Sequence, residues 1–288
     1  MKKTYATEFH CSDVLMAEQA KIDLLMSGMD LSGCVESYEK DKVTLSFFEK
    51  TKKSSAKKVL RIRKATGLSP EIKVLYDSEW KGKWKEGLKP FYLTENIQII
   101  PGKAKSKKVK AKREGIVLYI DTDIIFGSGL HPTTRMMAEF IESKAGKISN
   151  FFDIGTGTGI LALIAAGYGA GEIWAIDVSE DAVKNASANF RMNGVDPDLL
   201  EPVNLSSFHR KKVFDFVSAN LLTADLVKMK NKIVPFVAPG GYLAVSGVSK
   251  TNYNWFREHF RDASIRCVRV RSEAGWSGLL FKKNRARS

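Results

Sequence analysis

Cysteine is scarce in this sequence, and its three copies are widely separated. Cys11, Cys34 and Cys267 are odd in number, and none of them forms a C-x-x-C pair. This pattern argues against a disulfide framework and against a structural zinc site, so we expect three reduced cysteines in the core. The four histidines show no ligand spacing either. We therefore expect a protein without a bound metal.

Long hydrophobic runs are also missing. No stretch of 18 apolar residues occurs, and no apolar segment follows the two lysines of the N-terminal "MKKTYATEFHCSD". The sequence therefore predicts neither a membrane span nor a signal peptide, and it indicates a cytoplasmic protein.

Acidic residues are under-represented in the first part of the chain. Residues 1–120 hold 25 Lys or Arg against 15 Asp or Glu, which gives +10 of the net charge of +14. Two lysine-rich runs, 49–65 and 102–115, contain no aromatic residue that could stack on a base. Their charge suits contact with ribosomal RNA or with an acidic partner. A merely solvated basic surface is the alternative.

The chain is long enough for two domains: it has 288 residues, of which 44% are hydrophobic. Residues 1–76 predict a small ferredoxin-like α+β domain that recognises the substrate. Residues 77–92 predict a connecting helix, with Trp80 and Trp84 on one face. The βαββαβ order of the small domain comes from strands at 4–10, 35–38, 43–48 and 71–76 and from helices at 13–26 and 52–64.

Residues 93–288 read as a second α/β domain. Strands "FFDIG", "EIWAID", "FDFVSAN" and "YLAVSGV" alternate with helical segments, and "APGG" reads as a turn before the last of these strands. This alternation predicts a doubly wound, Rossmann-like parallel sheet. Two further strands, 265–271 and 276–282, predict an antiparallel hairpin at one edge of that sheet.

The glycines after the first of these strands indicate the cofactor. Gly155, Gly157 and Gly159 are spaced G-x-G-x-G, which is one residue short of the dinucleotide fingerprint. Asp153 precedes them, and a carboxylate there suits a positively charged sulfonium better than a pyrophosphate. Asp177 ends the next strand, where a carboxylate can accept both ribose hydroxyls of an adenosine. Together these residues favour S-adenosylmethionine.

Two other segments indicate where the reaction takes place. The segment "FDFVSANLL" places Asn220 just beyond the carboxyl end of a strand, at the edge of the sheet where open α/β folds place reactive groups, although Asn220 could also cap the next helix. The segment "FGSGLHPTT" reads as a loop over a ligand, so Phe126, Gly127 and Thr134 are candidate cofactor contacts. His131 in this loop is a structural hydrogen-bond partner in one interpretation and a general base in the other.

Five stretches, "FGSGLHPTT", "DIGTGTGILAL", "AIDVSEDAV", "ANLL" and "GWSGLLFKK", together resemble the PrmA family, the methyltransferases of large-subunit ribosomal protein L11. The resemblance is most specific over residues 121–283, and the lysine-rich loop 103–113 departs from it as an insertion. It implies transfer of methyl groups from S-adenosylmethionine to lysine amines of a ribosomal protein, with the N-terminal amine as a further acceptor. The family's cofactor contacts would fall on Thr134, Gly155, Asp177 and Asn220, and Asn220 would orient the amine.

Two other functions remain open at this point. A nucleic-acid amino methyltransferase shares this fold but often has Asn-Pro-Pro-aromatic at the position of Asn220, whereas Leu221, Leu222 and Thr223 follow Asn220 here. The second alternative function is that of a protein that binds the cofactor and interacts with the ribosome but has no catalytic activity. The presence of both Asp177 and Asn220 argues against that reading.

Overall fold

The computed structural model describes residues 3–29, 34–39, 42–76, 90–102, 115–121 and 131–285. The chain divides into two compact units, Met1–Leu88 and Lys89–Ser288. Three predicted features fall outside the described residues: residues 77–89 of the connecting helix, with Trp80 and Trp84, the lysine-rich loop 103–113, and Phe126 with Gly127. The last two residues of the predicted connector are not helical but begin strand β5 (Phe91–Thr94).

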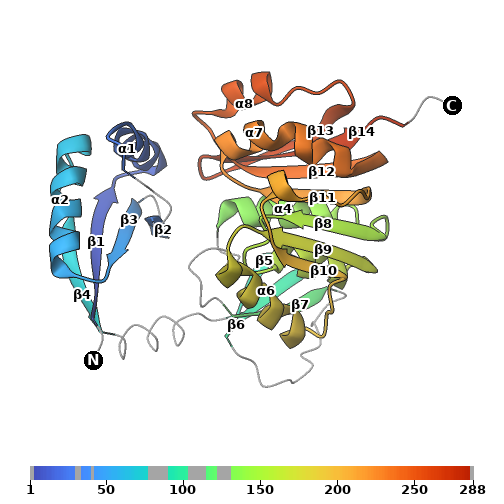
Figure 1. Cartoon of the computed structure of the whole chain (residues 1–288), viewed down its shortest axis with the longest axis horizontal. Helices are drawn as coiled ribbons and strands as arrows, with labels where there is room; N and C mark the ends of the chain where they lie inside the picture. Colours follow the sequence, from blue (N-terminus) through green and yellow to red (C-terminus); the bar gives the residue numbers. More distant parts are fainter. Residues whose placement is uncertain are drawn as a thin grey trace. The chain divides into compact units, whose positions relative to one another are not determined.

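The first unit is a four-stranded antiparallel sheet with two helices (Figure 1). The strand order is β2-β3-β1-β4, and Phe9, Leu24, Leu45 and Ile62 lie in its core. Along the chain its elements are β1 (Lys3–Cys11), α1 (Val14–Met26), β2 (Cys34–Glu39), β3 (Lys42–Glu49), α2 (Lys52–Thr66) and β4 (Glu71–Tyr76). Every element lies within a few residues of the segment that the hydrophobic pattern predicted.

The second unit is built on a seven-stranded mixed sheet with the order β10-β9-β8-β11-β12-β14-β13. The labels of Figure 1 follow this order from β10 upward to β12, with β13 and β14 above them. The first five strands are parallel, and β12, β14 and β13 pair antiparallel. The strands are β8 (Asn150–Ile154), β9 (Glu172–Asp177), β10 (Leu199–Pro202), β11 (Phe214–Asn220), β12 (Val237–Ser249), β13 (Ile265–Glu273) and β14 (Trp276–Lys283). The helices are α4 (Pro132–Glu142), α5 (Ile160–Gly167), α6 (Glu180–Met192), α7 (Thr223–Ile233) and α8 (Tyr253–His259).

The central strands are apolar on both sides because both faces of the sheet are covered. Phe151 and Phe152 are adjacent in β8, so their side chains point to opposite faces, and both are fully buried. Phe151 packs in the cluster that holds residues of α4, α5 and α6, whereas Phe152 packs in the cluster formed with α7 and α8. A continuous core on each face therefore fixes the strand ends that carry the predicted site.

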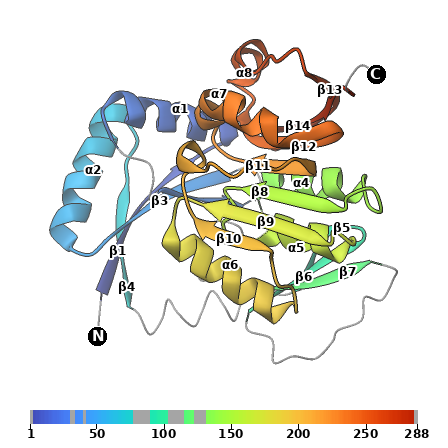
Figure 2. The same ribbon diagram turned by 45° about the vertical axis from the view of Figure 1, so that its right-hand side comes forward.

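A three-stranded sheet before α4 was not predicted. It consists of β5 (Phe91–Thr94), β6 (Ile97–Pro101) and β7 (Ile116–Ile120), and it lies beside the β8-β9-β10 half of the large sheet (Figure 2). Its inward side chains, such as Ile99 and Ile120, join the same core as α5 and α6. These short strands are stabilised by contacts with distant segments, which a local pattern does not reveal.

Two local expectations were wrong. The "APGG" segment does not form a separate turn, because β12 already begins at Val237. The pairing of β12 with β11 shifts register between Phe214 and Phe216, and this irregularity accommodates Gly240 at φ 82°. Cys267 is not a core residue, because it lies exposed on the edge strand β13, whereas Cys11 and Cys34 are buried as expected. Over the part of the chain that the structure describes, no helix is long and apolar enough to cross a membrane.

Candidate cofactor and amine site

The predicted site residues meet at the carboxyl ends of the parallel strands, where open α/β sheets bind their ligands. β8 leads into the glycine turn, β9 ends at Asp177, and β11 ends at Asn220. The N-terminus of α4 reaches the same edge, because Asn220 Nδ2 donates a hydrogen bond to Thr133 Oγ1 at 3.2 Å. Four segments that are far apart in the sequence thus contribute to one site.

The glycine turn adopts backbone conformations that only glycine accepts without strain. Gly155, Gly157 and Gly159 have φ values of 75°, 56° and 81°. A Cβ atom at Gly155 would lie 2.4 Å from Leu221 Cδ2, and one at Gly159 would lie 3.2 Å from Phe190 Cζ. A Cβ at Gly157 would meet no atom within 4 Å. Side chains therefore pack against the turn at Gly155 and Gly159, whereas Gly157 is open. This arrangement allows a cofactor to approach the backbone of the turn closely at Gly157.

Asp177 links the end of β9 to this turn. Its Oδ2 accepts a hydrogen bond from the Gly157 N–H at 2.9 Å, and its Oδ1 accepts one from the Ser179 N–H at 3.0 Å. A carboxylate oxygen can accept more than one hydrogen bond, so each oxygen keeps capacity for a ribose hydroxyl. The residue is half-buried, as a carboxylate that binds a ligand from the sheet edge should be.

Asp153 lies below the turn, where it is 1% exposed. Its carboxylate accepts hydrogen bonds from Ser218 Oγ at 2.5 Å and from Thr156 Oγ1 at 2.8 Å. Burial raises the pKa of Asp153 to about 6, and the nearby charge of Asp177 acts in the same direction, while the two hydroxyl hydrogen bonds oppose the shift. Through Thr156 the carboxylate supports the glycine turn, and a direct contact with the cofactor stays a prediction.

The raised pKa of Asp153 predicts a pH-dependent cost in stability. The folded state binds the Asp153 proton more tightly than the unfolded state, in which the pKa of Asp153 is the ordinary 3.8. Binding of this proton therefore stabilises the fold fully below pH 4, and the stabilisation is lost as the pH rises through about 6. We expect Asp153→Asn to gain stability relative to the original protein between pH 4 and pH 7, by up to about 3 kcal/mol. Urea unfolding at several pH values measures this difference. A difference that is constant across this range would contradict the raised pKa.

Asn220 is not the cap of the helix that follows it. The N-cap of α7 is Leu222, and Asn220 directs its amide nitrogen to Thr133 instead. Among the described residues, no hydrogen-bond donor reaches Asn220 Oδ1. The chain turns sharply here because Gly247, at φ 89°, lets the Leu221 carbonyl approach to 1.9 Å from where a Cβ would be. This close approach fixes the backbone just after Asn220.

The "HPTT" segment begins α4, as the proline suggested. His131 is the N-cap, Pro132 occupies the first turn, and Thr133 and Thr134 are both buried. The sequence had singled out Thr134 but not Thr133 or Ser218, which form the links to Asn220 and Asp153. Ser218 could have been found from strand register, since it faces Asp153 across β11 and β8.

Metal ligands are not grouped in this site. In the described parts of the chain, no three His, Cys, Asp or Glu side chains come together in a way that could hold a metal ion. The polar groups at the sheet edge are instead carboxylates, hydroxyls and one amide, which are suited to hydroxyl and amine partners.

Comparison with known proteins agrees with this geometry. The family model described as "Ribosomal protein L11 methyltransferase (PrmA)" matches residues 6–284. The chain is 33% identical over 220 residues to a protein of Citrifermentans bemidjiense named ribosomal protein L11 methyltransferase, with 74% of this chain and 70% of that protein covered. A protein of the same name from Staphylococcus aureus is 30% identical over 213 residues, with 73% and 67% covered.

A solved structure shares the fold. The crystal structure of ribosomal protein L11 methylase from Lactobacillus delbrueckii subsp. bulgaricus superposes with a TM-score of 0.62 at 23% identity. The match covers 68% of this chain and 100% of that one. The chain therefore contains an α/β methyltransferase fold with a central mixed sheet.

Proposed function

Because the chain belongs to the PrmA family, a family of S-adenosylmethionine-dependent methyltransferases, we propose that it methylates lysine amines of ribosomal protein L11, with the N-terminal amine as a further acceptor. The observation that carries this proposal is the orientation of Asn220. Its amide nitrogen is engaged by Thr133, and among the described residues its carbonyl oxygen has no donor. An acceptor at the ligand-binding edge of the sheet is what an incoming amine requires.

The residues of the sheet edge fit S-adenosylmethionine. The Asp177 carboxylate would bind the ribose hydroxyls, the open turn at Gly157 would contact the methionine part, and Gly155, Gly159 and Thr134 would shape the rest of the site. When bound, S-adenosylmethionine supplies a methyl group that its sulfonium has already activated. The same proposal includes Phe126 and Gly127 as residues that bind S-adenosylmethionine.

The protein must bring a neutral amine to this site. A lysine amine has an ordinary pKa of about 10.4, and partial desolvation near a positive charge lowers that pKa, so proton loss to water becomes easier. Asn220 Oδ1 would accept an N–H of the amine and direct its lone pair. Holding the reacting groups in this orientation can lower the barrier by several kcal/mol, about 7 or more in favourable cases. An uncharged acceptor can do so again for a second methylation, because the neutral monomethylated amine keeps one N–H.

The test is a labelling experiment. The purified protein is incubated with labelled S-adenosylmethionine and with separated ribosomal proteins or ribosomal RNA. We expect label in a single ribosomal protein, L11, and none in RNA. Label in RNA alone would instead support a nucleic-acid amino methyltransferase, and no label in either fraction would support a protein without catalytic activity.

We further propose that residues 1–76 form a ferredoxin-like substrate-recognition domain, that the segment before strand β5 connects it, and that the chain from β5 onward carries catalysis. The separate cores support this division, since the described members of the apolar cluster around Phe9 and Ile62 all belong to the first unit. Helix α2 carries seven Lys or Arg and no Asp or Glu, which suits an auxiliary contact with ribosomal RNA. A ribosomal substrate also implies activity in the cytoplasm.

This division predicts that cofactor binding and substrate recognition can be separated. We expect the fragment 89–288 to bind S-adenosylmethionine with an affinity within about twofold of the full chain, because the described members of its two apolar clusters all lie within this fragment. The KM for the protein substrate should rise about tenfold or more, the effect of losing roughly 1.4 kcal/mol of binding. Calorimetry and steady-state kinetics measure both. If the folded fragment has the KM of the full chain, the first unit does not recognise the substrate.

A further inference from the structure

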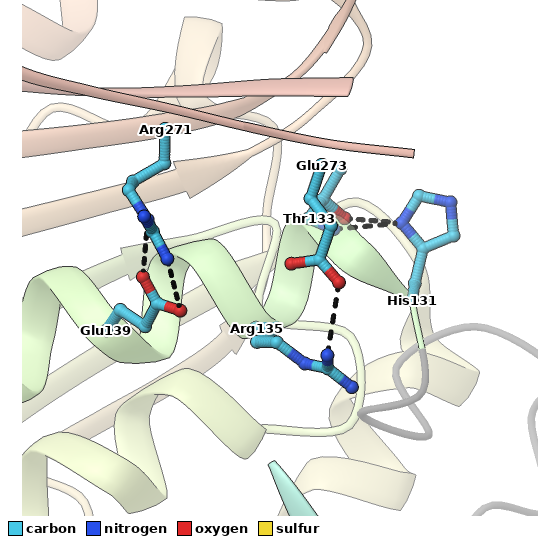
Figure 3. Close-up of polar contacts among 6 residues, drawn as sticks. All are labelled: His131, Thr133, Arg135, Glu139, Arg271 and Glu273. Atoms are coloured by element: carbon cyan, nitrogen blue, oxygen red, sulfur yellow. Dashed lines mark hydrogen bonds and ion pairs between the residues drawn. The ribbon is translucent and has the colours of Figure 1, made fainter. Parts of the chain in front are cut away.

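A chain of hydrogen bonds leads from Asn220 to the N-cap of α4. Asn220 Nδ2 lies 3.2 Å from Thr133 Oγ1, and Thr133 Oγ1 lies 2.7 Å from His131 Nδ1. His131 Nδ1 also accepts the backbone N–H of Thr133 at 3.3 Å. Figure 3 shows both contacts between His131 and Thr133 at the start of the helix.

The direction of this chain follows from its chemistry. A backbone N–H can only donate, so His131 Nδ1 must present its lone pair, and the ring carries its proton on Nε2. The Thr133 hydroxyl then donates its hydrogen to Nδ1, and its oxygen accepts from the Asn220 amide. Asn220 is thereby fixed with its NH2 group toward α4 and its carbonyl oxygen away from it. The opposite orientation would present N–H donors to the incoming amine.

The far end of the chain is held against the β13-β14 hairpin. The His131 ring meets Trp276 of β14 edge to face, with centroids 5.3 Å apart and an interplanar angle of 64°. Two ion pairs join α4 to β13 (Figure 3): Arg135 Nη1 lies 3.1 Å from Glu273 Oε1, and Arg271 Nε lies 2.7 Å from Glu139 Oε2. The Trp276 contact and the Arg135 pair hold the first turn of α4, and the Glu139 pair holds a later turn of the same helix.

We propose that His131 acts as a positioning residue for methyl transfer, and that it does so through the Thr133 hydroxyl, which sets the orientation of the Asn220 amide. The inference rests on the proposed role of Asn220 as the acceptor of the substrate amine. It assigns His131 neither a contact with the amine nor a proton transfer. Its function is to supply the lone pair that orders the hydroxyl.

Two pairs of variants separate the hydrogen bonds from packing. Thr133→Val keeps the shape of the side chain but removes the hydroxyl, whereas Thr133→Ser keeps the hydroxyl. His131→Phe keeps a ring against Trp276 but removes the acceptor, whereas His131→Asn keeps an acceptor and an N-cap but removes the ring. We expect Val and Phe to lower kcat about tenfold, the factor that a lost hydrogen bond gives, and Ser and Asn to recover most of that loss.

The measurements distinguish positioning from general damage. S-adenosylmethionine affinity by calorimetry should change little in all four variants. The melting temperature should change little in three of them and fall by about 2–4 °C in His131→Phe, which loses the N-cap acceptor of α4. The ¹⁵N NMR signals of the imidazoles, which His131→Asn assigns among the four histidines, should show Nδ1 of His131 without a proton. In an Asn220→Ala background, Thr133→Val should have no further effect, because the hydroxyl acts through Asn220.

Several results would overturn the inference. A protonated Nδ1 on His131 would reverse the hydrogen-bond chain. A kcat loss in His131→Asn as large as that in His131→Phe would make ring packing the cause. If Asn220→Ala is slow but Thr133→Val turns over at the normal rate, this inference fails while the proposed function stands. If Asn220→Ala itself is active, the proposed role of Asn220 fails.

Discussion

Replacing Asn220 with Ala is expected to slow methyl transfer about a hundredfold or more, since oriented reactions are this sensitive to a misplaced group. Asn220 lies at the end of β11, is half-buried and contributes no helix cap, so the sheet should stay folded. Affinity for S-adenosylmethionine should fall much less than the rate. The products should also shift toward fewer methyl groups per amine, because the transfer to a monomethylated amine, which keeps one N–H, uses the same acceptor.

Single-turnover kinetics and mass spectrometry of the protein substrate measure the rate and the products. Asn204→Ala is a matched control, because Asn204 also follows a strand and its side chain caps the short helix Leu205–Ser207. We expect that control to change stability but not turnover. A near-normal rate and product pattern in Asn220→Ala would remove Asn220 from the mechanism.

Replacing Asp177 with Ala is expected to weaken S-adenosylmethionine binding by about one to three orders of magnitude. The variant loses the proposed hydrogen bonds to the ribose, and bonds to a charged group contribute about 1.5–3 kcal/mol each. It also loses the bond that holds the Gly157 N–H, so the turn itself becomes less ordered.

Calorimetry measures the affinity, and Asp198→Ala is the control. Asp198 accepts the Ile173 N–H at 2.8 Å near the opposite end of β9, so this variant also loses a carboxylate bond to the backbone, but far along the strand from the site. We expect the control to bind the cofactor normally. Equal affinities in the folded Asp177→Ala variant and the original protein would contradict the cofactor assignment.

The residues that the sequence revealed are those whose role depends on neighbouring positions in the chain. The turn at Gly155, Gly157 and Gly159, the strand-ending Asp177 and the strand-ending Asn220 each combine a local pattern with a rule about parallel strands. Because the carboxyl ends of such strands share one edge, three separate motifs could be assigned to one site before their distances were known.

The features that the sequence did not reveal depend on contacts between distant segments. The side chain of Asn193, the C-cap of α6, forms hydrogen bonds with the backbone of Tyr119 in β7. Asn189, in the last turn of α6, does the same with the backbone of Asp121. No sequence pattern near Tyr119 predicts these hydrogen-bond partners. The bond between Thr133 and Asn220 joins residues 87 positions apart, so the orientation of the amide becomes visible only in the folded chain.

The most direct test of the central claim is intact and peptide mass spectrometry of L11 from the same organism after incubation with the protein and S-adenosylmethionine, beside an identical reaction with Asn220→Ala. The account predicts methyl groups on lysine side chains of L11 with the original protein, and far fewer at the same time point with the variant. Unmodified L11 in the presence of folded, cofactor-binding protein would contradict it.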